Sequence, residues 1–232
     1  SEAIIGVKLK NTPEEDFSKG VAISAGFHPD NKTHIETVRY GKGQTAMALL
    51  TTLLSDRKIP LPGLIRWGIS VLRAPLQFIT NFFPFNWARK TIILLVMQPI
   101  DNYLKLNYKP RWWRLGGFSM NSQLSTGKKI PSHIPIGEKT AHTIMSKTGG
   151  TILTTYMDSI FDIPTTAHIL GGACLGKNKD SGVVDENFEM FHYPGMYVID
   201  GSVVPSNLGV NPSLTITALA EYAMSRFPNK KI

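Results

Sequence analysis

The last part of the chain reads Thr166-Ala-His-Ile-Leu-Gly-Gly172, then Met196-Tyr-Val-Ile-Asp-Gly-Ser202, then Gly209-Val-Asn-Pro-Ser-Leu-Thr-Ile-Thr217. These stretches place a histidine, an Asp-Gly turn and an Asn-Pro helix start at the ends of predicted strands or helices, where α/β folds hold their ligands. A histidine and an asparagine brought together can handle the proton of an alcohol, and a helix N-terminus can stabilise a reduced, anionic cofactor. The three stretches therefore predict a ligand site of this kind.

The composition is that of a globular protein. Of the 232 residues, 42% are hydrophobic and 18% are charged, which argues against disorder and allows one large domain or two small ones. The single cysteine, Cys174, cannot form an internal disulfide or a cysteine-rich zinc site. Five further histidines have no metal-ligand spacing and are interpreted as structural or surface residues: His28, His34, His133, His142 and His192. We therefore expect no metal site.

The net charge of +8 permits nucleic acid, acidic membranes or anionic cofactors as partners. The lysines and arginines are scattered, however, and no basic helix carries interleaved aromatic residues, so we expect no nucleic acid partner. The first ten residues lack the pattern of a signal peptide, which favours the cytoplasm or the membrane periphery of a bacterium. They resemble a strand inside a fold, so we expect a piece of a longer protein.

Four stretches have the pattern of β-strands. Val21–Ala25 and His34–Tyr40 are separated by a turn-like Pro29-Asp-Asn-Lys32, which predicts a β-rich region. Lys90–Gln98 is an apolar run rich in β-branched residues, as in a buried central strand. Gly195–Gly201 is predicted to be a short buried strand that ends in a turn.

Three stretches have the pattern of helices. Met47–Leu54 follows a glycine turn, and Lys139–Lys147 is followed by Gly149-Gly150, which can end a helix. The clearest helix is Asn211–Ser225, because its asparagine can cap the N-terminus and the following proline suits the first helical position.

Gly41-Lys-Gly-Gln-Thr-Ala46 has the local form of a dinucleotide-binding fingerprint, since it lies between a predicted strand and a predicted helix. No second strand that ends in an acidic residue follows at the required spacing; the chain continues instead into Lys58-Ile-Pro-Leu-Pro-Gly63. We therefore interpret the stretch as an ordinary glycine turn.

Residues 64–85 are apolar and aromatic, but Arg66 and Arg73 interrupt them and Pro75 would kink or end a helix. The stretch is therefore no transmembrane span. The two arginines, seven residues apart, would share one helical face. Two interpretations remain open: an interfacial segment that touches a membrane, or ordinary packing in a subdomain that covers the substrate.

The three C-terminal stretches resemble the signature of the glucose–methanol–choline (GMC) oxidoreductases, which are FAD-dependent alcohol oxidases and dehydrogenases. The resemblance is closer to the bacterial sterol-oxidising members than to the family in general, and it extends upstream through Gly20–Asp30, His34–Gly43 and Thr91–Gln98. It implies oxidation of a sterol-like secondary alcohol to a ketone, with hydride transfer to FAD and with O₂ or another acceptor reoxidising the cofactor. A GMC dehydrogenase for another alcohol, and a peripheral membrane module without activity, are the alternatives.

The resemblance also implies catalytic residues. His168 matches the family's active-site histidine, and imidazole suits proton transfer near neutral pH. Asn211 matches the second polar group, which touches the hydroxyl or the flavin edge. Glu36 resembles the carboxylate that moves a proton during isomerisation of the steroid double bond; the alternative is a strand-surface glutamate paired with Arg39 or Lys32.

For the cofactor, Asp200 and Gly201 match the turn near the FAD ribityl and pyrophosphate groups. Backbone N–H donors, or a bond from the carboxylate to a ribityl hydroxyl, suit this turn better than a carboxylate facing phosphate. The helix start at Asn211, Pro212 and Ser213 is expected to aim its positive end at the flavin, where negative charge develops on reduction.

The fold class predicted from these patterns is α+β. Residues 1–164 are expected to form a substrate-binding region of sheet and helices. Residues 165–232 are expected to form the C-terminal part of an FAD/NAD(P)-binding-type α/β domain that carries the active-site motifs. The N-terminal βαβ unit for the ADP half of FAD has no counterpart in the sequence, so the chain alone is expected to be inactive.

Overall fold

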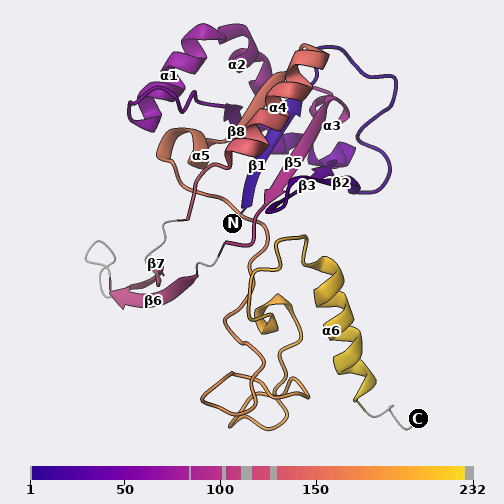
Figure 1. Ribbon diagram of the computed structural model, residues 1–232, viewed down its shortest axis with the longest axis vertical. Coiled ribbons are helices and arrows are strands. Elements are labelled where there is room, and N and C mark those ends of the chain that lie inside the picture. The colour runs from indigo at the N-terminus through magenta and orange to yellow at the C-terminus, as the bar shows by residue number, and fades with distance from the viewer. Residues whose placement is uncertain (1, 84, 101–102, 111–116, 126–129, 228–232) are drawn as a thin grey trace. The chain divides into compact units, whose positions relative to one another are not determined.

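The computed structural model describes residues 2–83, 85–100, 103–110, 117–125 and 130–227. The chain forms two compact units, Ser1–Thr165 and Thr166–Ile232 (Figure 1). The boundary lies close to the one expected from the sequence; the assignment of the units to substrate and cofactor remains a prediction.

The first unit is built on a six-stranded sheet with the strand order β2-β3-β5-β1-β8-β4, and every pairing in it is antiparallel. A separate two-stranded sheet consists of β6 and β7. The strands are β1 (Glu2–Lys8), β2 (Ile23–Asp30), β3 (Thr33–Val38), β4 (Thr51–Leu53), β5 (Thr91–Met97), β6 (Leu104–Pro110), β7 (Phe118–Leu124) and β8 (Thr151–Thr155). With the helices, this makes the α+β class expected from the sequence.

The helices of the first unit cover both faces of the six-stranded sheet. They are η1 (Lys42–Leu50, a 3₁₀ helix), α1 (Gly63–Arg73), α2 (Pro75–Phe82), α3 (Trp87–Lys90), α4 (Pro135–Thr148) and α5 (Tyr156–Phe161). Helix α4 lies across one face (Figure 1), where its Ala141 packs with Ile5, Ile35 and Val96 in one core cluster. A Cβ on Gly137 would come within 2.7 Å of the Val96 side chain, so glycine allows α4 to approach β5 closely.

The opposite face of the sheet has its own core. Its buried members include Leu53, Trp87, Ile93 and Leu153, with Phe78 of α2 packed against them. Because neighbouring side chains of a strand alternate between faces, strands β1, β3, β5 and β8 contribute to both cores. Two hydrophobic layers therefore hold the sheet between α4 on one side and η1, α2 and α3 on the other.

The second unit is mostly irregular. Its regular elements among the described residues are the short 3₁₀ helix η2 (Gly201–Val203) and α6 (Ser213–Ser225), and its backbone otherwise forms isolated bridges. Val184, Phe188, Val203 and Val204 form its buried core together with Ala223 of α6.

Several elements agree with the sequence. A β2–β3 hairpin forms as expected, although β2 begins later than Val21 and runs through Pro29 and Asp30 of the expected turn. The buried strand β5 and the helix α4 lie where they were expected, and Gly149 ends α4 in the left-handed conformation (φ 61°). Pro75 ends α1 and begins α2, as its missing N–H and fixed φ favour.

Two expectations were wrong. Met47–Leu54 is not one helix, because the helical turn ends at Leu50 and β4 begins at Thr51, where its backbone pairs with β8. Gly195–Gly201 is not a buried strand, since it pairs only through one isolated bridge at Tyr197, whose side chain is 39% exposed. The apolar run Met196–Ile199 was mistaken for a strand because Val198 and Ile199 pack on the core of the second unit from a loop.

The rejection of the dinucleotide fingerprint is confirmed. The stretch at Gly41 leads into η1 and then into β4, which runs antiparallel to β8. In a dinucleotide-binding βαβ unit an α-helix connects two neighbouring parallel strands. Here a 3₁₀ helix connects β3 to β4, and three other strands lie between them in the sheet, so this stretch cannot serve as one.

Candidate active site

Glu36 lies in the middle of β3 and is only 8% exposed. It sits opposite Leu95 of β5, on the face of the sheet turned away from α4. Its Oε1 lies 3.1 Å from Nε2 of His34, two residues earlier on the same face. Its Oε2 is buried, and no described residue forms a hydrogen bond with it. The carboxylate therefore has one occupied oxygen and one oxygen left for another group.

His34 connects Glu36 to the neighbouring strand. Its Nδ1 lies 3.0 Å from Nε2 of His28 on β2, and the two ring centroids are 4.5 Å apart. Gly26 leaves room for this arrangement, because a Cβ there would lie 3.1 Å from Cε1 of His34. Three titratable side chains thus form a continuous hydrogen-bonded chain across the hairpin.

The expected alternative for Glu36 was wrong. Arg39 donates instead to Glu15 at 2.9 Å, and the backbone N–H of Lys32 donates to Asp30. The interpretation of His28 and His34 as ordinary structural or surface residues missed their hydrogen bonds with each other and with Glu36. The contact of His34 with Glu36 could have been predicted, since a His-x-Glu pattern on a strand places both side chains on one face.

In the second unit, the three C-terminal stretches converge at Gly201. A Cβ on this glycine would meet the Ile169 carbonyl oxygen at 3.3 Å and the Ile216 side chain of α6 at 3.1 Å. Backbone hydrogen bonds run from Gly171 to Gly201 and from Ala173 to Ser202. The structure therefore brings together the segments that carry the predicted site residues of this unit, while Glu36 belongs to the first unit.

His168 is partly buried at the start of this convergence, and its backbone N–H donates to Thr166 Oγ1 at 3.0 Å. Asp200 accepts hydrogen bonds from the hydroxyl and the backbone N–H of Ser202. These two bonds lower the pKa of the Asp200 carboxyl. Asp200 therefore caps η2 as a carboxylate, and the backbone of the turn remains the better candidate for contact with a cofactor.

Asn211 caps α6. Its Oδ1 accepts from the backbone N–H of Ser213 at 3.0 Å and from the Ser213 hydroxyl at 2.6 Å. The helix begins at Ser213 rather than at Pro212, which is the preceding cap position. Asn211 thus satisfies the first N–H group of the helix, as expected of a capping residue, but it does so from the position before the cap. Its role in a reaction remains a prediction.

Replacing Asn211 with alanine is expected to lower the free energy of unfolding by about 1 kcal/mol, because the cap is lost. Asn211→Ser can keep the cap and should lie within a few tenths of a kcal/mol of the wild type. Denaturant unfolding of both variants measures this difference. If the amide also orients the substrate, Asn211→Ser loses alcohol oxidation while keeping its stability; equal stability of the alanine variant and the wild type would contradict the capping role.

The described residues fit one end of FAD. The first N–H groups of a helix have no partner within the helix, and Asn211 engages only that of Ser213. The next residue, Leu214, is 82% exposed, so this positive helix end is open to an anionic or electron-rich group. Within the described part of the chain, no βαβ unit accommodates the ADP half. The start of α6 and the Gly201 turn could therefore hold the flavin end only.

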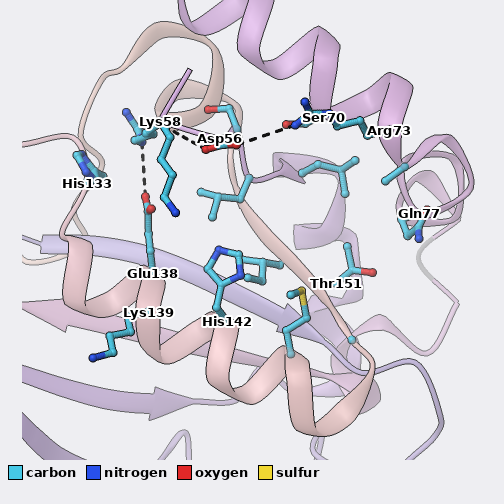
Figure 2. Close-up of a pocket in the computed structure, with 18 of the residues that line it drawn as sticks. Asp56, Lys58, Ser70, Arg73, Gln77, His133, Glu138, Lys139, His142 and Thr151 are labelled. Carbon is cyan, nitrogen blue, oxygen red and sulfur yellow. Dashed lines mark hydrogen bonds and ion pairs between the residues drawn. The ribbon is translucent and has the colours of Figure 1, made fainter. Parts of the chain in front are cut away.

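A separate cavity of about 960 Å³ lies between α4, the start of α2 and strands β4 and β8 (Figure 2). Its wall includes Ile152 of the core beneath α4 and Leu53 of the other core, so the cavity lies at the β8–β4 end of the sheet, whereas Glu36 lies on β3 near the opposite end. Figure 2 shows Glu138 and His142 of α4 facing Asp56 and Lys58 across it. The cavity is therefore not continuous with the carboxylate that the sequence singled out.

One edge of this cavity is a buried ion cluster around Arg57. The guanidinium lies 2.5 Å from Asp158, 2.5 Å from Asp162 and 3.6 Å from Glu138. Asp162 also pairs with Arg66 of α1 at 2.5 Å. Burial raises the pKa of both Glu138 and Asp158, and the positive charge of Arg57 opposes this rise. The cluster ties the loop after β4 to α1, α4 and α5.

Glu138→Gln is expected to change how stability depends on pH. A raised pKa means that folded Glu138 holds its proton to higher pH than the unfolded chain does, so ionisation favours unfolding. The wild type should lose stability as the pH rises from the ordinary glutamate pKa through the raised one. The variant should lack the part of this loss that comes from Glu138, whereas the part that comes from Asp158 should be the same in both proteins. Unfolding free energies across this pH range measure the difference, and parallel curves would contradict it.

Comparison with known proteins indicates the class of enzyme to which the C-terminal part of the chain is similar. Residues 127–220 match the model of the GMC oxidoreductase family. Over these residues the chain is similar to the C-terminal domain of the GMC oxidoreductases.

Within this family, the chain is similar to cholesterol oxidases. It is 42% identical over 235 residues to a cholesterol oxidase of Mycobacterium tuberculosis (strain H37Rv), covering 99% of this chain and 40% of that protein. It is 38% identical over 230 residues to a cholesterol oxidase of Acinetobacter baumannii, covering 99% of this chain and 41% of that protein. A shorter match, 42% identical over 55 residues, joins 24% of this chain to 7% of a long-chain-alcohol oxidase of Arabidopsis thaliana. The chain thus spans about two fifths of the cholesterol oxidases it matches.

Proposed function

We propose that the protein containing this chain oxidises a sterol-like secondary alcohol to a ketone, with FAD as the hydride acceptor and O₂ or another acceptor reoxidising it. The observation that carries the proposal is the identity of about 40% with cholesterol oxidases over nearly the whole chain. Residues 1–164 would form the substrate side, and residues 165–232 would belong to the FAD-binding-type domain.

Each candidate residue has a defined task in this reaction. When bound, FAD supplies the acceptor for the hydride of the carbinol carbon. His168 would hold the hydroxyl and take its proton, and the Asn211 amide would orient the hydroxyl or the flavin edge. The Gly201 backbone and the start of α6 would favour negative charge beside them. The free Oε2 of Glu36 supports a role in moving a proton between carbon atoms of the steroid.

Anaerobic mixing tests the proposal. The intact protein, loaded with FAD, is mixed with a 3β-hydroxysterol or with a long-chain primary alcohol, and flavin absorbance and the carbonyl product are followed. We expect bleaching and a ketone with the sterol. Bleaching only with the linear alcohol would instead support the second candidate, an alcohol oxidoreductase of the kind suggested by the 55-residue match. No bleaching with either alcohol would overturn both.

Contact with a membrane is a further candidate role of α1 and α2. None of the described helices is long and apolar enough to cross a bilayer. Trp67 and Phe78 pack together, and Trp67 donates to Thr52 at 2.8 Å, whereas Leu72 and Leu76 are largely exposed. Lipid binding would therefore involve the latter pair. Flotation with vesicles should weaken in Leu72→Ser/Leu76→Ser if these helices touch lipid.

A further inference from the structure

We propose that His34 is a positioning residue for Glu36. Its Nε2–H occupies Oε1 of the carboxylate, so that Oε2 alone takes a proton from the steroid and returns it. The proposal rests on the proposed role of Glu36 as the group that moves this proton. Its basis is the contact of His34 Nε2 with Glu36 Oε1 at 3.1 Å, together with the burial of Oε2, which receives no hydrogen bond from any described residue.

The hydrogen of this contact belongs to His34. An ionised carboxylate can only accept hydrogen bonds, so the ring nitrogen that faces it carries the hydrogen. The contact of His34 Nδ1 with His28 Nε2 at 3.0 Å does not change this, because either histidine can donate there while Nε2 of His34 keeps its hydrogen. Oε1 is therefore held by a donor that cannot take a proton from it.

The two oxygens of Glu36 consequently differ when the steroid proton arrives. If the proton binds to Oε2, Oε1 can still accept from Nε2–H of His34, because an uncharged carboxyl group keeps an acceptor oxygen. If the proton bound to Oε1 instead, it would face the hydrogen on Nε2, and the contact with the ring would be lost. The donor thus leaves Oε2 as the oxygen that acts as the base.

The proton transfer itself is balanced without exchange with water. When a 5-en-3-one steroid becomes a 4-en-3-one, the C4–H bond breaks, its proton bonds to Oε2, and the electron pair is shared along the dienolate from the ketone oxygen to C6. A C6–H bond then forms with the same proton, and Oε2 belongs to a carboxylate again. The steroid gains and loses no electrons.

Packing keeps His34 and Glu36 in place. Their side chains are only 15% and 10% exposed. A Cβ on Gly26, which lies opposite Glu36 in the hairpin, would come within 3.1 Å of Cε1 and 3.3 Å of Nε2 of His34, so the ring fits closely against the glycine. The His28 ring packs against it as well, with the centroids 4.5 Å apart. The imidazole therefore has little freedom to turn its donor away from Glu36, and water has little access to the carboxylate.

The test uses the intact protein with FAD and a 5-en-3-one steroid that carries two deuterium atoms at C4, so that isomerisation is measured apart from oxidation. The wild type should deliver deuterium to C6 of the product. His34→Ala removes the donor and opens space for water beside Oε1, so the deuterium should be lost to water. Its kcat for isomerisation should fall at least about tenfold, as expected when a reacting group is misplaced, while KM and the oxidation of the 3β-alcohol stay within about twofold.

Two further variants separate the donor from the packing of the hairpin. His34→Gln keeps an N–H donor of similar reach, so it should retain most of the isomerisation rate and of the deuterium. Thr37→Val is the matched control, because it removes the contact with the Ser24 hydroxyl at 3.0 Å in the same hairpin, from the residue next to Glu36 on the other face of β3. It should behave like the wild type. If His34→Gln or Thr37→Val is as slow as His34→Ala, the proposal is wrong.

The outcomes also separate this positioning from the proposed role of Glu36. If Glu36→Gln abolishes isomerisation but His34→Ala keeps the wild-type rate or the wild-type retention of deuterium, or if the wild type itself loses the deuterium to water, the positioning is wrong and the role of Glu36 stands. If Glu36→Gln isomerises the steroid like the wild type, or the wild type does not isomerise it, both ideas fail. Nitrogen-15 NMR gives an independent readout: Nε2 of His34 should carry a hydrogen, and a bare Nε2 beside ionised Glu36 would overturn the proposal.

Discussion

Replacing His168 with alanine in the intact, FAD-loaded protein is expected to lower the rate of alcohol oxidation by about 10² to 10⁴-fold, the range typical of a general acid–base group. The imidazole would hold the hydroxyl and take its proton as the hydride leaves, and no methyl group can do either. Steady-state rates with a 3β-hydroxysterol measure the loss. FAD binding should be retained, because the segment at His168 packs on Gly201 through the backbone of Ile169.

The matched control for this variant is His192→Asn. His192 is an exposed histidine of the same unit with φ 68°, and asparagine tolerates this left-handed backbone. Its oxidation rate should equal that of the wild type. Turnover by His168→Ala at the wild-type rate would reject His168 as the group that handles the proton.

Replacing Arg57 with methionine is expected to lower the free energy of unfolding by about 3 to 5 kcal/mol, the usual cost of breaking a buried ion pair from one side. The change leaves Asp158 and Glu138 without the guanidinium that both face at the cavity edge. It also removes bonds from the loop after β4 to Ser132 and to the Asp158 carbonyl. Denaturant unfolding measures the loss.

Arg73→Met is the matched control on the same cavity. The Arg73 side chain is 66% exposed and lies 4.0 Å from Asp56, so its removal should cost no more than about 1 kcal/mol. Equal losses in the two variants would show that the Arg57 cluster is no more stabilising than a surface pair.

Local signals predicted much of the fold. A continuous apolar run gave the central strand β5, and an Asn-Pro start gave α6, because burial and capping act over a few residues. The same reasoning failed at Gly195–Gly201, where an apolar run forms only an isolated bridge with Glu189. It failed again at Thr51, where the backbone hydrogen bonds of β4 with β8 outweighed the helical propensity of the segment.

In the candidate site too, some features could be predicted from the sequence and others could not. The family resemblance singled out Glu36, His168 and Asn211, and the capping contact of Asn211 follows from its sequence alone. The alternation of side chains along β3 already placed His34 on the same face as Glu36, but the contact of His34 with His28 follows only from the pairing of β2 with β3.

The family resemblance, the class of fold and the elements stabilised by near neighbours in the chain could all be predicted from the residues. The partners of the buried charges could not. Arg57 meets Asp158 across 101 residues, and His34 meets His28 through the pairing of two strands. Such contacts form because burying a charge without an opposite charge or a hydrogen bond costs free energy. Which partner is available depends on how the sheet and the helices bring distant segments together.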